Sequence, residues 1–224
     1  MTSFSQHHED EFIANFIKKN NLKITPFLVE IGAAYPEHIS NSRYFIGEGW
    51  NALLIDANES FYQLLKHYHS TNDKVTVVQT LISDTDGHAK YNNLEDATLA
   101  GISETGIEME TKKLSTVLRE KNLGTDIGIL SIDVEGYDNQ VLKSILDDKI
   151  KAQIIIIEAN TKEERQKHID TLSPEYTLVE ELGRGTHDGG WAIHTNKLTQ
   201  KVLGWNPFIG VNTIWIHKDV YQKS

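Results

Sequence analysis

The sequence predicts an α/β protein with a doubly wound, mostly parallel, seven-stranded sheet that carries helices on both faces. Two observations support this prediction. Short apolar runs rich in valine and isoleucine alternate along the chain with longer amphipathic segments, which is the pattern of strands joined by crossover helices. The runs are apolar nearly throughout, as in parallel strands that are buried on both faces. Because no repeat or linker interrupts the alternation, we expect a single domain over residues 1–224.

The individual elements follow from local signals. Phe12, Ile13, Phe16 and Ile17 share one face of an expected helix, and Ser5 with the acids after it suits the helix start. Expected helices span residues 9–20, 40–46, 59–68, 114–121, 139–146 and 162–172, and expected strands span 27–31, 52–55, 75–81, 127–132, 153–157, 176–182 and 213–217. Residues 88–112 alternate only weakly, which predicts short strands and a mobile loop. Residues 1–25 are expected to form an N-terminal helical segment, and residues 183–211 an insertion.

Composition excludes several classes of function. The chain has 224 residues with 32 acids against 22 bases, a net charge of −10 that disfavours a nucleic-acid partner. It has no cysteine, which excludes disulfide scaffolds, thiolate zinc sites and cysteine nucleophiles. No apolar run approaches the length of a membrane span or a signal peptide, so a cytoplasmic location is the expectation.

Polar or acidic residues stand at the ends of the expected strands, where ligands of open parallel sheets bind. These residues are Glu30, Asp56, Ser83, Asp133, Glu135, Glu158 and Asn160. One such residue at each strand end is the pattern of a ligand rim. The alternative is that acids simply begin the following helices, where the helix dipole favours them.

The stretch over residues 27–58 predicts the kind of ligand. Gly32 ends the first strand, but Ala33 to Pro36 follow in place of the later glycines that a pyrophosphate needs for close approach. Asp56 ends the second strand and can accept hydrogen bonds from a ribose diol. This combination disfavours NAD and fits S-adenosylmethionine, which carries no phosphate.

Several blocks in the same order resemble the FkbM family of S-adenosylmethionine-dependent methyltransferases. The matching blocks are Ser5-Gln6 with Glu9-Asp10, Val29 to Ala33, Ser40 to Ser42, Gly49-Trp50, Leu54 to Asp56, Leu81 to Asp84 with Gly87, Leu130 to Gly136, and Ile156 to Glu158. The resemblance covers most of the chain up to about Asn160 and implies the Rossmann-like class I methyltransferase fold. The family usually has Asp where Glu30 stands, often Asn or His where Ala34 stands, and Glu where Asp138 stands.

The resemblance also implies cofactor contacts. Glu30, Gly32 and Ala33 would line the methionine side of S-adenosylmethionine, with Gln6 and Asn41 as polar contacts near the same end. Asp56 would bind the ribose, Ile82 and Ser83 would border the adenine, and Asp133 would complete the set. For Gln6 and Asn41, ordinary helix capping is an equal alternative.

Asp133 and Glu135 alternate along one strand end, so both carboxylates can face the same cleft. Methyl transfer to a hydroxyl requires removal of its proton, and Glu135 is the candidate base, with His187 as a second candidate. Alternatively, Asp133, Glu158 and Asn160 offer three oxygen ligands for Mg²⁺. A third reading is that the two acids only bond backbone amides of neighbouring loops.

The leading hypothesis is therefore O-methylation of a hydroxyl on a carbohydrate or a glycosylated metabolite, with a small molecule or glycan as acceptor. The family supplies this acceptor class. Segments at the place of residues 183–211 commonly shape the acceptor pocket in such folds. The alternatives are N- or carboxyl-methylation of another acceptor, and a catalytically silent nucleoside-binding partner module.

Overall fold

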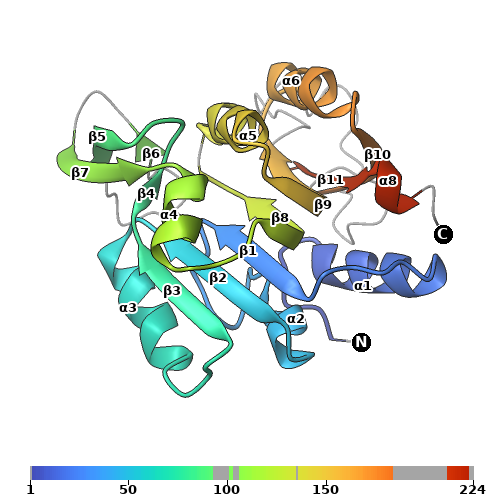
Figure 1. Cartoon of the computed structure of the whole chain (residues 1–224), viewed down its shortest axis with the longest axis horizontal. Helices are drawn as coiled ribbons and strands as arrows, with labels where there is room; N and C mark the ends of the chain where they lie inside the picture. The colour runs from blue at the N-terminus through green and yellow to red at the C-terminus, as the bar shows by residue number, and fades with distance from the viewer. Residues whose placement is uncertain (1, 93–100, 103–105, 135, 184–210, 222–224) are drawn as a thin grey trace, which may run out of the picture.

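The computed structural model describes residues 2–92, 101–102, 106–134, 136–183 and 211–221, and its centre is a seven-stranded sheet (Figure 1). Its strands are β1 (Phe27–Ile31), β2 (Asn51–Asp56), β3 (Val75–Gln79), β8 (Asp126–Ile132), β9 (Lys151–Ala159), β10 (Tyr176–Gly183) and β11 (Val211–His217). They lie in the order β10-β11-β9-β8-β1-β2-β3. Only β11 runs antiparallel to its neighbours β9 and β10. The predicted fold class is confirmed.

Helices cover both faces of this sheet because side chains of a strand alternate between its faces. The helices are α1 (Glu9–Lys19), α2 (Arg43–Gly47), α3 (Glu59–Tyr68), α4 (Leu114–Glu120), α5 (Asp138–Asp147), α6 (Lys162–Leu172) and α8 (Lys218–Tyr221). Val29 and Ile31 of β1 belong to the core beneath α4, α5 and α6. Leu28 belongs to the opposite core, which α1 and α2 cover. The sheet is thus doubly wound, as predicted.

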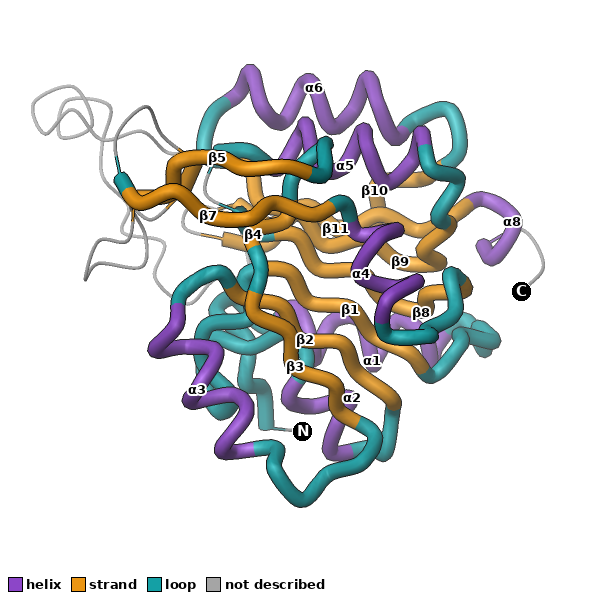
Figure 2. The backbone as a smooth tube through the Cα atoms, turned by 60° about the vertical axis from the view of Figure 1, so that its left-hand side comes forward, coloured by secondary structure: helices purple, strands orange, loops and turns teal. Residues whose placement is uncertain are grey.

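The prediction of one strand over residues 75–81 was wrong. The strand β3 ends at Gln79, and a second, four-stranded sheet begins after Thr80, in the order β4-β7-β5-β6. Its strands are β4 (Leu81–Ile82), β5 (Gly87–Asn92), β6 (Gly101–Ile102) and β7 (Ile107–Lys112), grouped beside the main sheet in Figure 2. Leu81 and Ile82 pair with β7 instead of β2. The strands β5 and β7 are largely exposed, so they lack the apolar alternation by which a strand is recognised.

The expected start of the first helix at residue 9 is confirmed, and one later helix start differs from the prediction. The residue before α1 is His8, while Ser5, the expected start signal, accepts from the Asp10 N–H at 3.2 Å and donates to the Asp10 carboxylate at 2.7 Å. The helix expected from residue 40 begins at Arg43, since the Asn41 backbone N–H donates to Glu30 instead. The short helix α8 had no sequence signal. Within the part of the chain described above, no helix has the length and apolarity that crossing a bilayer requires.

His168 is a buried polar side chain in α6. It is fully buried, and neither ring nitrogen has a hydrogen-bond partner among the described residues. Burial lowers the pKa of His168 from 6.5 to about 4, with Lys167 nearby adding to the shift. As the pH falls below about 6.5, the unfolded chain takes up this proton and the folded chain does not, so His168 destabilises the fold in acid.

We therefore expect His168→Leu to raise the melting temperature by a few degrees at neutral pH, because an unsatisfied buried polar group costs roughly 1–3 kcal/mol. The gain over the wild type should grow between neutral pH and pH 5, as measured by thermal unfolding. His67→Leu, at an exposed histidine of α3, is the matched control and should show no growing difference. A gain that is equal at both pH values would contradict the assigned protonation.

Candidate functional site

A cavity of about 220 Å³ opens at the carboxyl ends of the central strands. The ends of β1, β2, β4, β8 and β9 all contribute to its lining. Strand order reverses between β1, which continues into β2, and β8, which lies on the other side of β1. In open α/β sheets such a reversal is where ligands bind. Of the predicted site residues, the cavity is lined by Gln6, Gly32, Asp56, Ile82, Asp133 and Glu158.

Gly32 brings two of these strand ends together. Its φ of 81° lies in the left-handed region that only glycine adopts without strain. A Cβ atom at this position would lie 1.9 Å from the carbonyl oxygen of Asp133. The Gly32 N–H donates to the Ile55 carbonyl at 2.9 Å, and the Asp133 N–H donates to the Ile31 carbonyl at 3.1 Å. The glycine is therefore required by the close approach of the β8 end to the turn after β1.

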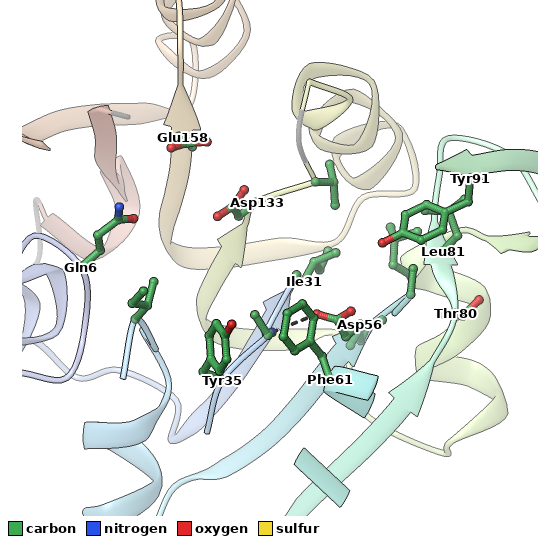
Figure 3. A pocket seen from close by; sticks show the side chains of 17 residues that line it. Gln6, Ile31, Tyr35, Asp56, Phe61, Thr80, Leu81, Tyr91, Asp133 and Glu158 are labelled. Atoms are coloured by element: carbon green, nitrogen blue, oxygen red, sulfur yellow. Dashed lines mark hydrogen bonds between the residues drawn. The ribbon is translucent and has the colours of Figure 1, made fainter. Parts of the chain in front are cut away.

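Asp56 lies at the floor of the cavity and is 7% exposed. One carboxylate oxygen accepts from the Ala34 N–H at 2.9 Å (Figure 3), and the other accepts from the Asn58 N–H at 2.8 Å. Burial raises the pKa of Asp56 to about 6, against the lowering effect of these two hydrogen bonds. The two backbone donors fix the orientation of a carboxylate that retains lone pairs for hydroxyl groups of a ligand.

Glu30 and Asn41 lie behind the cavity wall rather than in it. Glu30 is 4% exposed and accepts from the Asn41 backbone N–H at 2.9 Å, while the Asn41 amide donates to the Ser131 hydroxyl at 3.0 Å. Burial raises the pKa of Glu30 to about 7, although polar groups of Ser42 and Asn41 oppose the shift. The pair joins β1, β8 and the loop before α2, and thereby supports the loop over residues 33–41.

Ala33 and Ser83 also lie outside the lining. Ala33 is buried in the apolar core beneath α2 and α3. The Ser83 N–H donates to the Lys112 carbonyl at 3.0 Å, and its hydroxyl donates to Asp84 at 3.2 Å. Ser83 therefore joins β4 to β7, and the neighbouring Ile82 is the residue that faces the cavity.

The end of the cavity formed by Asp133 and Glu158, away from Asp56 and Ile82, is acidic. Figure 3 shows Asp133 and Glu158 on the side of the cavity facing Tyr35, with Gln6 beside them. Glu158 is half-buried and accepts from the Asn160 amide at 2.8 Å. Burial raises the pKa of Glu158, and the negative charges of Asp138, Glu164 and Glu9 add to the shift. The predicted bases Glu135 and His187 lie outside the described residues.

Asp138 holds the loop that carries the acids. Its carboxylate is buried and accepts from the N–H groups of Val134 and Gly136, both at 3.0 Å. Tyr137 of the same loop donates its hydroxyl to Asp84 at 3.1 Å. The loop after β8 is therefore fixed at both the α5 side and the β4 side, which makes Asp138 a positioning residue of the site.

The predicted magnesium site finds no support. Asn160 presents an N–H to Glu158, whereas a shared metal ion would require oxygen atoms of both residues to face it. Within the described ranges, no three His, Asp or Glu side chains lie close enough together to hold a metal ion. The residues present do not fit the predicted ion.

Sequence reasoning missed the aromatic and apolar part of the lining. Tyr35 and Phe61 meet edge to face at 4.9 Å, and Tyr91 reaches the cavity from β5 of the second sheet. Thr80 also lines the cavity, and its hydroxyl has no partner among the described residues. Short strands were expected over residues 88–112 and are found there, but their pairing into a second sheet, which places Tyr91 and Thr80 at the cavity, was not predicted.

The N-terminal segment is fastened to the edge of the cavity by two fully buried acids of α1. Asp10 accepts from the Phe4 N–H at 2.8 Å, and Glu9 accepts from the His7 N–H at 2.8 Å and from the Asn212 amide at 2.7 Å. These bonds flank Gln6, which lines the cavity. Two bonds local to the helix start and one long-range bond from Asn212 therefore fix the segment that carries Gln6.

Comparison with known proteins identifies the domain. The model of the family described as "Methyltransferase FkbM domain" matches residues 30–183. No curated protein matches the chain in sequence.

Solved structures share the fold at low sequence identity. The chain resembles the METTL16 methyltransferase domain (TM-score 0.50, 12% identity, 92% of this chain and 65% of that one). It also resembles a putative tRNA (m1A22) methyltransferase from Streptococcus pneumoniae (TM-score 0.50, 11% identity, 97% and 71%). A methyltransferase FkbM from Methylobacillus flagellatus KT matches with a TM-score of 0.48 and 12% identity. The match covers 93% of this chain and 50% of that protein, so the chain spans about half of its length.

We expect Gly32→Ala to destabilise the fold by about 3 kcal/mol, because the new methyl group would collide with the Asp133 carbonyl in a backbone conformation unfavourable to alanine. Urea unfolding measures the change. Gly47→Ala is the matched control: nothing lies within 4 Å of its would-be Cβ atom, so alanine should stabilise α2 by about 0.5 kcal/mol. Equal stabilities of the two variants would contradict the close contact.

Proposed function

The chain belongs to the methyltransferase FkbM domain family of S-adenosylmethionine-dependent methyltransferases, and on that premise we propose that it methylates a hydroxyl oxygen of a carbohydrate or a glycosylated metabolite. In this proposal the cavity at the strand ends binds the methyl donor, and a small molecule or glycan enters from the acidic end.

The observation that carries the donor assignment is the geometry of Asp56. It is a buried carboxylate at the end of β2 that two backbone N–H groups hold in place. It faces the cavity at the carboxyl ends of the central strands, where ligands of open α/β sheets bind. In our proposal it accepts hydrogen bonds from the ribose hydroxyls. Ile82 would border the adenine with Ser83 behind it, and Gly32, Asp133 and Gln6 would surround the methionine side. Glu30, Ala33 and Asn41 would support this wall from behind.

The chemical step follows from the donor. A lone pair of the acceptor hydroxyl attacks the sulfonium methyl group in line with the breaking carbon–sulfur bond, and that bond's electrons remain on sulfur. The hydroxyl proton passes to a general base, for which Glu135 is the first candidate and His187 the second. Asp133 would orient the reacting groups, because it lines the cavity beside the Gly32 turn.

The lining disfavours a phosphorylated acceptor. Among the described lining residues there is no lysine, arginine or histidine, so the cavity offers no cation to a phosphate group. The net charge of −10 points the same way. We further propose that residues 183–211, of which all but the two ends lie outside the described residues, shape the acceptor pocket of a single domain. A cytoplasmic location stays a prediction.

We expect S-adenosylhomocysteine to raise the melting temperature by several degrees, since a ligand at about 100 times its Kd stabilises by about 2.7 kcal/mol. Asp56→Ala should abolish the rise in a differential scanning experiment. Asp73→Ala, at an exposed acid in the turn before β3, should retain it. An unchanged melting curve of the wild type at saturating ligand would refute the donor site.

Glu135→Gln tests the base. The variant should bind S-adenosylhomocysteine as tightly as the wild type does, and lose about 10²–10⁴-fold in turnover, the usual contribution of a positioned base. Turnover is measured as release of S-adenosylhomocysteine in the presence of a panel of sugars and glycosides. Full activity of Glu135→Gln together with loss of activity in His187→Ala would reassign the base to His187.

A further inference from the structure

Two carboxylates lie side by side at the acidic end of the cavity. The register of β8 and β9 pairs Ile132 with Ile157, so Asp133 and Glu158 are the next residues of two neighbouring strands. Adjacent strands are about 4.8 Å apart, which brings the two side chains close together. Both line the cavity and face its open space in Figure 3.

Glu158 is held in this position rather than free to turn away. The Asn160 amide donates to its Oε2 atom at 2.8 Å. Its surroundings are acidic on three further sides, from Asp138 of α5, Glu164 of α6 and Glu9 of α1. Glu9 is itself fixed by the Asn212 amide and the His7 N–H.

Nothing basic in the described lining offsets these charges, because the lining there contains no lysine, arginine or histidine. The Asp133–Glu158 pair is therefore a negative end of the cavity, in which Glu158 is half-buried and Asp133 is exposed. A cation beside the half-buried Glu158 is attracted more strongly than in bulk water and is screened less by salt. The negative charge of this pair suits a ligand that carries a positive charge at the same end of the cavity.

We propose that the Asp133–Glu158 pair makes the cavity select the cationic sulfonium donor over the neutral thioether product. The inference rests on the proposed function, since it takes S-adenosylmethionine as the donor. In the transfer step the methyl carbon moves to the acceptor oxygen and the carbon–sulfur electrons stay on sulfur. The acceptor's hydroxyl proton leaves to the general base. The sulfur thereby loses its positive charge, and with it that atom's attraction to Glu158. Product release is favoured by the reaction itself.

The test uses two ligands of nearly the same shape that differ in charge. S-Adenosylhomocysteine has a neutral sulfur, and sinefungin has a protonated amine on the carbon that replaces it. Isothermal titration calorimetry gives the ratio of their Kd values for the wild type and for Glu158→Gln. Glu163→Gln, an exposed glutamate in the first turn of α6 outside the lining, is the control for the same change in net charge.

We expect the wild type to bind sinefungin more tightly than S-adenosylhomocysteine. Glu158→Gln should reduce this preference about tenfold, equivalent to about 1.4 kcal/mol, while Glu163→Gln leaves it within twofold. Asp133→Asn serves as the second variant if Glu158→Gln does not fold, and should reduce the preference severalfold.

A preference that is the same in the wild type and both cavity variants overturns the inference, provided that the wild type binds S-adenosylhomocysteine. A preference lost equally in Glu163→Gln also overturns it, because the effect would then belong to net charge. Millimolar Mg²⁺ that displaces sinefungin but not S-adenosylhomocysteine would assign the pair to a metal instead. Failure of the wild type to bind either ligand would overturn the donor site itself.

Discussion

The structure depends on the contact between Gly32 and the carbonyl oxygen of Asp133. This contact lets the turn after β1 and the end of β8 approach so closely that no side chain fits between them. Two hydrogen bonds at the same place, from Gly32 to Ile55 and from Asp133 to Ile31, lock the three strand ends together. As a result, the floor of the cavity and its acidic end are parts of one rigid arrangement of the sheet.

Buried carboxylates organise the rest of the site. Asp56, Asp138 and Asp10 each accept from two or more donors of nearby loops, and so fix segments that have no regular structure of their own. Burial makes this costly, and it raises the pKa of Asp56 and Asp138. The hydrogen bonds recover part of that cost, since backbone N–H groups favour the ionised form. Acids in this chain therefore act as loop anchors.

The second sheet contributes residues to the cavity that the main sheet forms at its strand ends. By ending β3 at Gln79, the chain turns Leu81 and Ile82 toward β7 and carries Tyr91 to the cavity. The parallel sheet supplies the polar floor and the acids, while the second sheet, α3 and the loop before α2 supply the apolar walls. A site with a polar floor and aromatic walls is the usual form of a pocket for a nucleoside-sized ligand.

Sequence patterns alone were enough to predict the doubly wound sheet, the glycine turn and the positions of the strand-end acids. These features follow from local patterns, because an apolar run of strand length predicts a buried strand, and an acid at its end is expected at the ligand edge. The family resemblance predicted a methyl-donor site, and the matched domain over residues 30–183 confirms the family.

Only the tertiary structure decided which of those residues share a cavity. It separated Asp56, Asp133 and Glu158, which line the cavity, from Glu30, Ala33 and Asn41, which lie behind its wall. It also brought in Tyr91, Thr80 and Phe61. The physical reason is that side-chain direction depends on strand register and on long-range hydrogen bonds, such as those from Asn212 to Glu9 and from Asn41 to Ser131, which join residues far apart in the chain.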